Sequence, residues 1–297
     1  MSKKFYGVIP PIVTPFDENG NIDEAKLRRE VRLMIDSGVH GLSFAGSTGE
    51  GSMLSDEEIA RGVSIVQDEN KEGLPLMVGI IRVSAKQAIS AGLAAKAAGA
   101  DALMCTPAFY PPYYHGPYDA DNYKYYQEIS DGVDLPIIIY NVIGNNPIIP
   151  ATMEKICKIK NVVGIKQSVG GIHSLTDMIN VNGENTLVFG AQDDLMFVSY
   201  VLGAVGAISA ILTVFPELCV EQWNAVQAGD INKALEIHYR ILPVWRLIEG
   251  SSFPGKLKAA LKLMGRDCGK ARTPIITPED EDLAELKAAL IKGGFIK

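Results

Sequence analysis

The stretch LMVGIIRVSAKQAISAGLAAKAAGADALMC, residues 76–105, contains one complete strand, helix and strand. Leu76–Ile80 and Ala102–Cys105 are short apolar runs, typical of strands that are buried on both faces. Between them, Ser84 can cap a helix over Ala85–Ala98. Two strands joined by a helix pair in parallel, because the chain crosses back over the sheet between them.

The same unit repeats along most of the 297-residue chain. The predicted strands are Gly7–Val13, Val39–Ala45, Leu76–Ile80, Ala102–Cys105, Ile137–Tyr140, Val162–Lys166, Leu187–Gly190 and Ala207–Ala210. The predicted helices after them are Asp23–Ser37, Asp56–Asn70, Ala85–Ala98, Asp121–Ser130, Ala151–Ile159, Ile172–Val181, Asp193–Gly203 and Pro216–Ala228. This alternation predicts a closed (β/α)8 TIM barrel over residues 1–229. An open doubly wound sheet is the alternative, but it usually has fewer strands and a glycine-rich phosphate turn.

The remaining residues, 230–297, carry no strand pattern. Three further helices are predicted there, at Ile231–Ile248, Pro254–Met264 and Pro278–Ile291. No Pro/Gly/Ser-rich linker separates them from the barrel, so we expect a C-terminal three-helix extension that packs on it.

The composition excludes several classes of protein. The net charge is -7 and no basic cluster is present, so nucleic acid is not an expected partner. The four cysteines lie far apart, which favours reduced, buried thiols over a disulfide or zinc framework. The N-terminus reaches prolines before any apolar segment of signal length, so a cytoplasmic location is expected.

Leu195–Phe215 is uncharged over a length that can span a membrane. Gly203 and Gly206 divide it, and no basic residues flank it. We therefore interpret this segment as buried core and expect no membrane partner.

Reactive groups of a parallel barrel sit at the carboxyl ends of its strands. Lys166 is such a group, at the end of the apolar run in NVVGIKQS, residues 161–168. Burial disfavours a charged ammonium and favours the free amine, which can attack a ketone to form a Schiff base. The alternative is a lysine whose stem packs while its head reaches water.

Residues at the ends of two other predicted strands can assist the chemistry of that amine. Tyr140 ends the neighbouring strand, where its phenol can move protons, although a tyrosine at the core rim is the commoner case. Gly46-Ser47-Thr48-Gly49-Glu50-Gly51 is not a P-loop, but its amides and hydroxyls can cradle a carboxylate or phosphate.

Metal chemistry has little support, and we expect no metal and no cofactor. The four histidines are scattered and no HExxH pattern is present. Asp193 and Asp194 can bind a cation, but as the start of a predicted helix they more simply complement its dipole.

GSTGEG, YN and GIKQS occur in that order, after the second and fifth strands and in the sixth. With them the chain resembles the class I, pyruvate-dependent aldolases that include dihydrodipicolinate synthase and N-acetylneuraminate lyase. The resemblance implies a Schiff base on Lys166, proton transfer by Tyr140, and a keto-acid carboxylate held by Ser47 and Thr48, with Gly46 beside them. It also places the Ile208 carbonyl near bound pyruvate.

The resemblance further implies a homotetramer in which a tyrosine after the fourth strand completes a partner subunit's site. Tyr110 is the first candidate, with Tyr113 and Tyr114 as alternatives.

Two departures concern the second substrate. Dihydrodipicolinate synthases carry an arginine after YN that grips the carboxylate of aspartate semialdehyde, whereas this chain has Asn145, which lacks a cationic fork. KQS resembles the KQT of sialic acid lyases, so Ser168 can bind a polyol, but Ala210 replaces their serine in the eighth strand.

The leading hypothesis is a lyase that cleaves a 2-keto-3-deoxy acid to pyruvate and an aldehyde, or forms it. The first alternative is dihydrodipicolinate synthase, which condenses pyruvate with aspartate semialdehyde. A non-catalytic protein that binds a small carboxylate and a metal-dependent barrel enzyme are the remaining alternatives.

Overall fold

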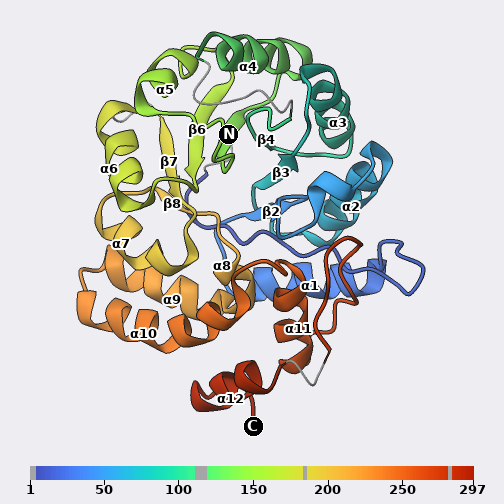
Figure 1. The fold of residues 1–297 in the computed structure, drawn as a ribbon, viewed down its shortest axis with the longest axis vertical. Coiled ribbons are helices and arrows are strands. Elements are labelled where there is room, and N and C mark those ends of the chain that lie inside the picture. Colours follow the sequence, from blue (N-terminus) through green and yellow to red (C-terminus); the bar gives the residue numbers. More distant parts are fainter. Residues whose placement is uncertain (1–4, 111–118, 183–185, 280–282) are drawn as a thin grey trace.

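The computed structural model describes residues 5–110, 119–182, 186–279 and 283–297. Eight parallel strands occupy its centre, in the order β1-β8-β7-β6-β5-β4-β3-β2 (Figure 1). They are β1 (Gly7–Val8), β2 (Leu42–Phe44), β3 (Leu76–Ile80), β4 (Ala102–Cys105), β5 (Ile137–Asn141), β6 (Val162–Gln167), β7 (Leu187–Gly190) and β8 (Gly206–Ala207). A parallel bridge between Pro11 and Ser43 joins the two ends of the sheet. The predicted (β/α)8 barrel is confirmed.

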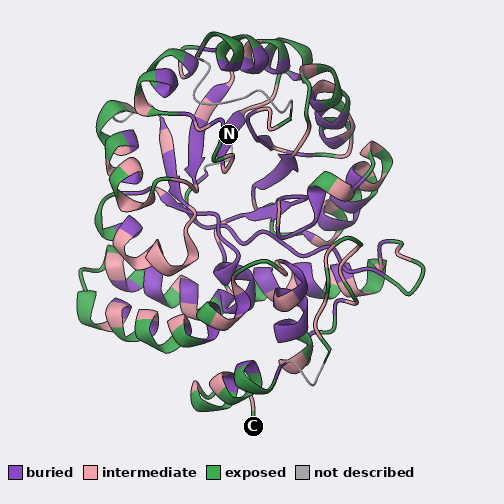
Figure 2. Cartoon of the chain, in the orientation of Figure 1, coloured by how far each residue is buried: buried purple, intermediate pink, exposed green. Residues whose placement is uncertain are grey.

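Helices surround the strands and present their apolar faces inward. They are α1 (Glu24–Asp36), α2 (Asp56–Glu69), α3 (Ala85–Ala97), α4 (Asp119–Val133), α5 (Pro150–Ile156), α6 (Gly171–Asn182), α7 (Met196–Val201), α8 (Ile211–Val214) and α9 (Pro216–Gln227), with short 3-10 helices η1 (Gly51–Met53) and η3 (Asp193–Leu195). The strands are almost wholly buried, whereas the helices are buried on one side and exposed on the other (Figure 2). Burial on both faces explains why the strand sequences are unbroken apolar runs. Burial on one side explains why the helix sequences mix apolar and polar residues.

Hydrogen bonds from capping side chains mark the predicted starts of two helices, α2 and α3. Ser55 and Glu58 form a reciprocal capping box at the start of α2. The Ser84 side chain accepts a hydrogen bond from the backbone amide of Gln87 at the start of α3.

The extension consists of α10 (Ile231–Ile248), α11 (Gly255–Leu263) and α12 (Ala284–Lys292). α10 packs along α9, α11 reaches α8, and α12 lies outermost (Figure 1). The third helix was predicted from Pro278, but it begins at Ala284, and residues 280–282 lie outside the described part of the chain.

Several predicted boundaries were wrong. The first strand ends at Val8 rather than Val13, because Pro10 and Pro11 have no N–H for the ladder. The second is shorter than Val39–Ala45, and the eighth ends at Ala207 rather than Ala210.

The uncharged segment Leu195–Phe215 is divided among α7, β8 and α8, so its interpretation as barrel core is confirmed. None of the described helices is long and apolar enough to cross a membrane.

Candidate active site

Lys166 and Tyr140 lie side by side at the carboxyl ends of β6 and β5. They are register partners in the parallel ladder, which places their side chains on the same face of the sheet. The Lys166 Nζ lies 3.8 Å from the centroid of the Tyr140 ring. Each residue is only 5% exposed. The structure thus brings together the amine and the phenol that were expected to be neighbours.

The interior of the barrel around Tyr140 is apolar. Tyr140 packs in a buried cluster with Ile138 of its own strand, Met104 of β4, Phe189 of β7 and Ile208, which follows β8. Such a lining excludes water, which strengthens electrostatic interactions at the amine and protects an imine from premature hydrolysis.

The Tyr140 hydroxyl also reaches the loop that follows β2. Its Oη lies 3.0 Å from the Ser47 Oγ, and either atom can donate the hydrogen. One phenol therefore links the amine to the predicted carboxylate cradle. A proton can pass along hydroxyl groups at this distance.

The cradle is a compact turn. The Glu50 amide donates to the Ser47 carbonyl at 3.1 Å, and the Gly51 amide donates to the Gly46 carbonyl at 3.0 Å. Within the described part of the chain, neither the Ser47 nor the Thr48 amide donates to a backbone carbonyl. The Ser47 and Thr48 amides therefore have no backbone carbonyl among the described residues that would compete with an anion.

Glycine is required where this turn meets the barrel. A Cβ on Gly51 would lie 1.6 Å from the Ala45 carbonyl oxygen, and one on Gly79 would lie 2.3 Å from the same atom. Ala45 itself has a φ of 56°, in the left-handed region. The glycines allow the turn to fold tightly over the ends of β2 and β3.

Ser168 and Ile208 lie beside the ends of β6 and β8. The Ser168 hydroxyl oxygen is buried and has no hydrogen-bond partner among the described residues. Ile208 is fully buried, and its amide donates to the Gly190 carbonyl at 3.0 Å. The Ser168 hydroxyl at the end of β6 is thus left without a structural hydrogen bond among the described residues.

The two asparagines after β5 have different surroundings. Asn145 is exposed. Asn146 is fully buried, exchanges hydrogen bonds with Asn122, and donates to the Ala108 carbonyl at 3.0 Å. Asn146 is therefore committed to holding the loops after β4 and β5, whereas Asn145 is exposed to solvent.

Tyr110 is 66% exposed beyond the end of β4. Within the described part of the chain, Tyr110 makes no hydrogen bond or ring contact with Lys166. The alternatives Tyr113 and Tyr114 lie outside the described residues.

Asp193 accepts hydrogen bonds that join two loops, which is a larger role than the dipole complementation expected from the sequence. Its carboxylate accepts hydrogen bonds from the Ser209 hydroxyl and, at 2.7 Å, from the Ile211 amide. Burial raises the pKa of Asp193 to about 6, while these hydrogen bonds and the nearby charge of Lys166 act in the opposite direction. Asp193 therefore joins the loops after β7 and β8 and lies near enough to Lys166 for the lysine charge to act on it. No group of three or more His, Cys, Asp or Glu residues suited to a metal ion occurs among the described residues.

Sequence reasoning missed the roles of Asn141 and Gln167. They are register partners on β5 and β6, and the Asn141 amide donates to the Gln167 side chain at 2.9 Å. Asn141 also exchanges hydrogen bonds with the backbone of Ile148. These contacts fix the loop that carries Asn145; the polar residues beside Tyr140 and Lys166 were the available signal.

Comparison with known proteins places the chain in a family. The profile of the Dihydrodipicolinate synthetase family matches residues 4–292. The 4-hydroxy-tetrahydrodipicolinate synthase of Methanothrix thermoacetophila is 33% identical over 97% of this chain and 97% of its own. That of Methanopyrus kandleri is 32% identical over 100% of this chain and 99% of its own.

Solved structures agree. The dihydrodipicolinate synthase of Acinetobacter baumannii, complexed with pyruvate, superposes with a TM-score of 0.92 at 28% identity and covers 99% of this chain and 100% of its own. The prophage protein YagE of E. coli K12, also in complex with pyruvate, gives 0.91 at 28% identity over 98% of this chain and 99% of its own. This chain is therefore a class I, pyruvate-dependent aldolase and belongs to the dihydrodipicolinate synthetase family.

Proposed function

We propose that Lys166 forms a Schiff base with pyruvate and that the enzyme cleaves a 2-keto-3-deoxy acid to pyruvate and an aldehyde, or forms it. One observation carries this proposal: the buried Lys166 amine lies against Tyr140, whose hydroxyl meets Ser47 in the cradle. The amine attacks the keto carbon and water leaves. The protonated imine then accepts the electron pair of the breaking C–C bond, which yields an enamine and the aldehyde.

The other predicted residues have roles around that nitrogen. Tyr140 moves protons during imine formation and C–C cleavage. The amides and hydroxyls of Ser47 and Thr48, with Gly46 beside them, hold the keto-acid carboxylate. The Ile208 carbonyl lies near the bound pyruvate.

Ser168 and Asn145 are proposed to contact the aldehyde part of the substrate. The buried, unpartnered hydroxyl of Ser168 supports this role, since such a group favours a hydrogen-bonding ligand. The exposure of Asn145 leaves its amide accessible. The hydroxyl groups of a sugar acid can form hydrogen bonds with both the Ser168 hydroxyl and the Asn145 amide.

The second candidate is condensation of pyruvate with aspartate semialdehyde. The names of the curated relatives favour this reaction over the cleavage proposed first. The residue that argues against it is Asn145, because an amide cannot provide the bidentate cationic grip of an arginine on a second carboxylate.

A pair of assays separates these reactions. We expect pyruvate release from a panel of 2-keto-3-deoxy sugar acids, and weak or no condensation with aspartate semialdehyde. Efficient condensation, with no release from the panel, would establish the second candidate instead.

A non-catalytic carboxylate-binding protein is distinguished by a simpler measurement. Pyruvate incubated with the enzyme in D₂O should exchange its methyl protons, because the enamine forms and reverts. Binding of pyruvate without exchange would favour the non-catalytic alternative.

We propose a homotetramer in which Tyr110 enters a partner subunit's site. The resemblance to the family supports this assembly, and the 66% exposure of Tyr110 in a single chain leaves its side chain accessible to a partner. The cytoplasmic location also stays a prediction.

A further inference from the structure

A buried ion pair connects the cradle to the C-terminal extension. Glu50 follows Ser47, Thr48 and Gly49 directly in the chain, and its Oε1 lies 2.6 Å from the Nζ of Lys258 on α11. Both side chains are 0% exposed. The site and the extension thus meet through two charges that are removed from water.

Such a pair is poorly explained by stability alone. Two charges lose their hydration on burial, and apolar residues of similar size often serve stability as well or better. Burial lowers the pKa of Lys258, and the carboxylate of Glu50 opposes that shift. A buried pair does constrain the relative positions of the two segments that carry it, because each charge must stay within reach of the other.

The geometry that it enforces is that of the cradle. Glu50 has φ 57° and ψ 30°, a left-handed backbone conformation that residues other than glycine rarely adopt. Its amide closes the turn onto the Ser47 carbonyl, and its carbonyl accepts a hydrogen bond from the Met53 amide at 2.9 Å. If the Glu50 side chain is fixed, the backbone that presents Ser47 and Thr48 is fixed with it.

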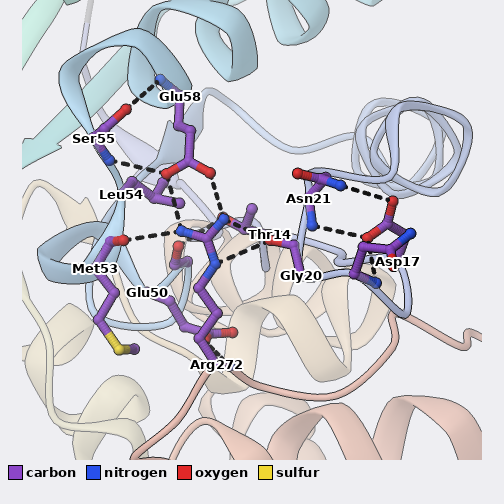
Figure 3. A network of polar contacts seen from close by, with 12 residues as sticks. Thr14, Asp17, Gly20, Asn21, Glu50, Met53, Leu54, Ser55, Glu58 and Arg272 are labelled. Carbon is purple, nitrogen blue, oxygen red and sulfur yellow. Dashed lines mark hydrogen bonds and ion pairs between the residues drawn. The ribbon is translucent and has the colours of Figure 1, made fainter.

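Arg272, in the segment after α11, provides a second connection (Figure 3). Its backbone amide donates to the Glu50 Oε2 at 2.8 Å. Its guanidinium donates to the Met53 carbonyl at 2.9 Å and pairs with the Glu58 carboxylate. The extension therefore contacts the turn and the start of α2 together.

We propose that the C-terminal extension positions the carboxylate cradle, with Glu50, Lys258 and Arg272 as positioning residues for Ser47 and Thr48. This inference rests on the proposed function in so far as the cradle binds the carboxylate of pyruvate. The three residues touch no reacting atom. Their effect is on the affinity for the keto acid, through the arrangement of the amides and hydroxyls that bind it.

The chain offers a matched control. Glu30 on α1 and Arg266 after α11 form another buried ion pair, at 2.6 Å, with side chains 0% and 10% exposed. Arg266 also donates to the Val214 carbonyl at 3.3 Å, far along the chain from the cradle. Loss of this pair removes comparable charges without touching the turn.

The test compares the double variants Glu50→Gln with Lys258→Met and Glu30→Gln with Arg266→Met. Pyruvate is trapped on the enzyme with borohydride over a range of concentrations. For the first variant we expect the half-saturating pyruvate concentration to rise about tenfold or more, the scale of one lost hydrogen bond to a charged group. The maximum trapped fraction should stay at the wild-type level. The control variant should keep the wild-type concentration.

Hydrogen exchange supplies a readout that needs no activity. Amides of residues 46–53 should exchange faster in the first variant, relative to β3 in the same molecule, and at the wild-type rate in the control. Should the Glu50 and Lys258 variant not fold, Arg272→Met, in a side chain that is 22% exposed, takes its place with the same two readouts.

Unchanged exchange and unchanged half-saturation in the first variant would overturn the inference, as would equal changes in both variants. Wild-type enzyme that traps no pyruvate would refute the proposed function. The exchange rates would still decide whether the extension positions the turn.

Discussion

Tyr140 is the residue on which the proposed chemistry converges, because it contacts the amine with its ring and the cradle with its hydroxyl. Replacing it with phenylalanine keeps the ring and removes the proton carrier. We expect kcat for aldol cleavage to fall by about 10²–10⁴-fold, the usual contribution of a positioned acid–base group.

Tyr126→Phe is the control for that prediction. Tyr126 is fully buried, and its hydroxyl donates to the Cys105 carbonyl at 3.3 Å rather than to a proposed site residue. Steady-state assays should give nearly wild-type kcat for this variant. Wild-type kcat in Tyr140→Phe would remove the phenol from the mechanism.

Asp193 gives a prediction about pH. Its pKa is raised from 3.8 to about 6, so its carboxyl holds a proton more tightly in the folded chain than in the unfolded one. Its contribution to stability is fully present below about pH 4 and is lost as the pH rises through about 6, a change of about 3 kcal/mol.

Asp193→Asn removes this titration. The free energy of unfolding of the wild type, minus that of the variant, should therefore decrease between about pH 4.5 and about pH 7.5 in urea titrations. An equal difference at both pH values would show that Asp193 titrates normally.

At the scale of single elements, the turn between β2 and α2 depends on close backbone contact. Gly51→Ala would place a methyl group 1.6 Å from the Ala45 carbonyl oxygen, so the turn must move. We expect a loss of about 1–3 kcal/mol in the free energy of unfolding, with weaker binding of pyruvate.

Gly144→Ala is the matched substitution, since nothing lies within 4 Å of the added Cβ. Denaturant unfolding should place it within about 0.5 kcal/mol of the wild type. Equal effects of the two substitutions would contradict the close packing of the turn.

Elements were predictable from sequence where burial leaves a continuous apolar signal. β3, β4 and β7 have the predicted bounds because both of their faces are covered. Strand ends were less predictable where proline removes a donor, as at Pro10 and Pro11, or where the chain turns into a short helix, as at α8.

The site was partly predictable for the same reason. Lys166 and Tyr140 stand out as polar residues at the ends of apolar strands, and register makes them neighbours. The contact of Glu50 with Lys258 left no local signal, because charged residues are usually exposed and this pair meets only in the folded chain. Asp193 was likewise read as a helix-start acid, since its bonds to Ser209 and Ile211 cross between loops.

At the scale of the whole molecule, we predict a homotetramer in which the exposed Tyr110 reaches a partner subunit. Sedimentation equilibrium should give a mass about four times the 32.1 kDa of one chain. Tyr110→Phe should lower kcat while that mass is retained, because the hydroxyl serves a partner's site. A fully active monomer would contradict both statements.

The central claim is that Lys166 is the nucleophile, and it has a direct measurement. Enzyme incubated with pyruvate, reduced with borohydride and digested should carry the reduced pyruvate adduct on the peptide that contains Lys166, and Lys166→Ala should carry none. An unmodified Lys166 in an active enzyme, or turnover that survives undiminished in Lys166→Ala, would contradict the account.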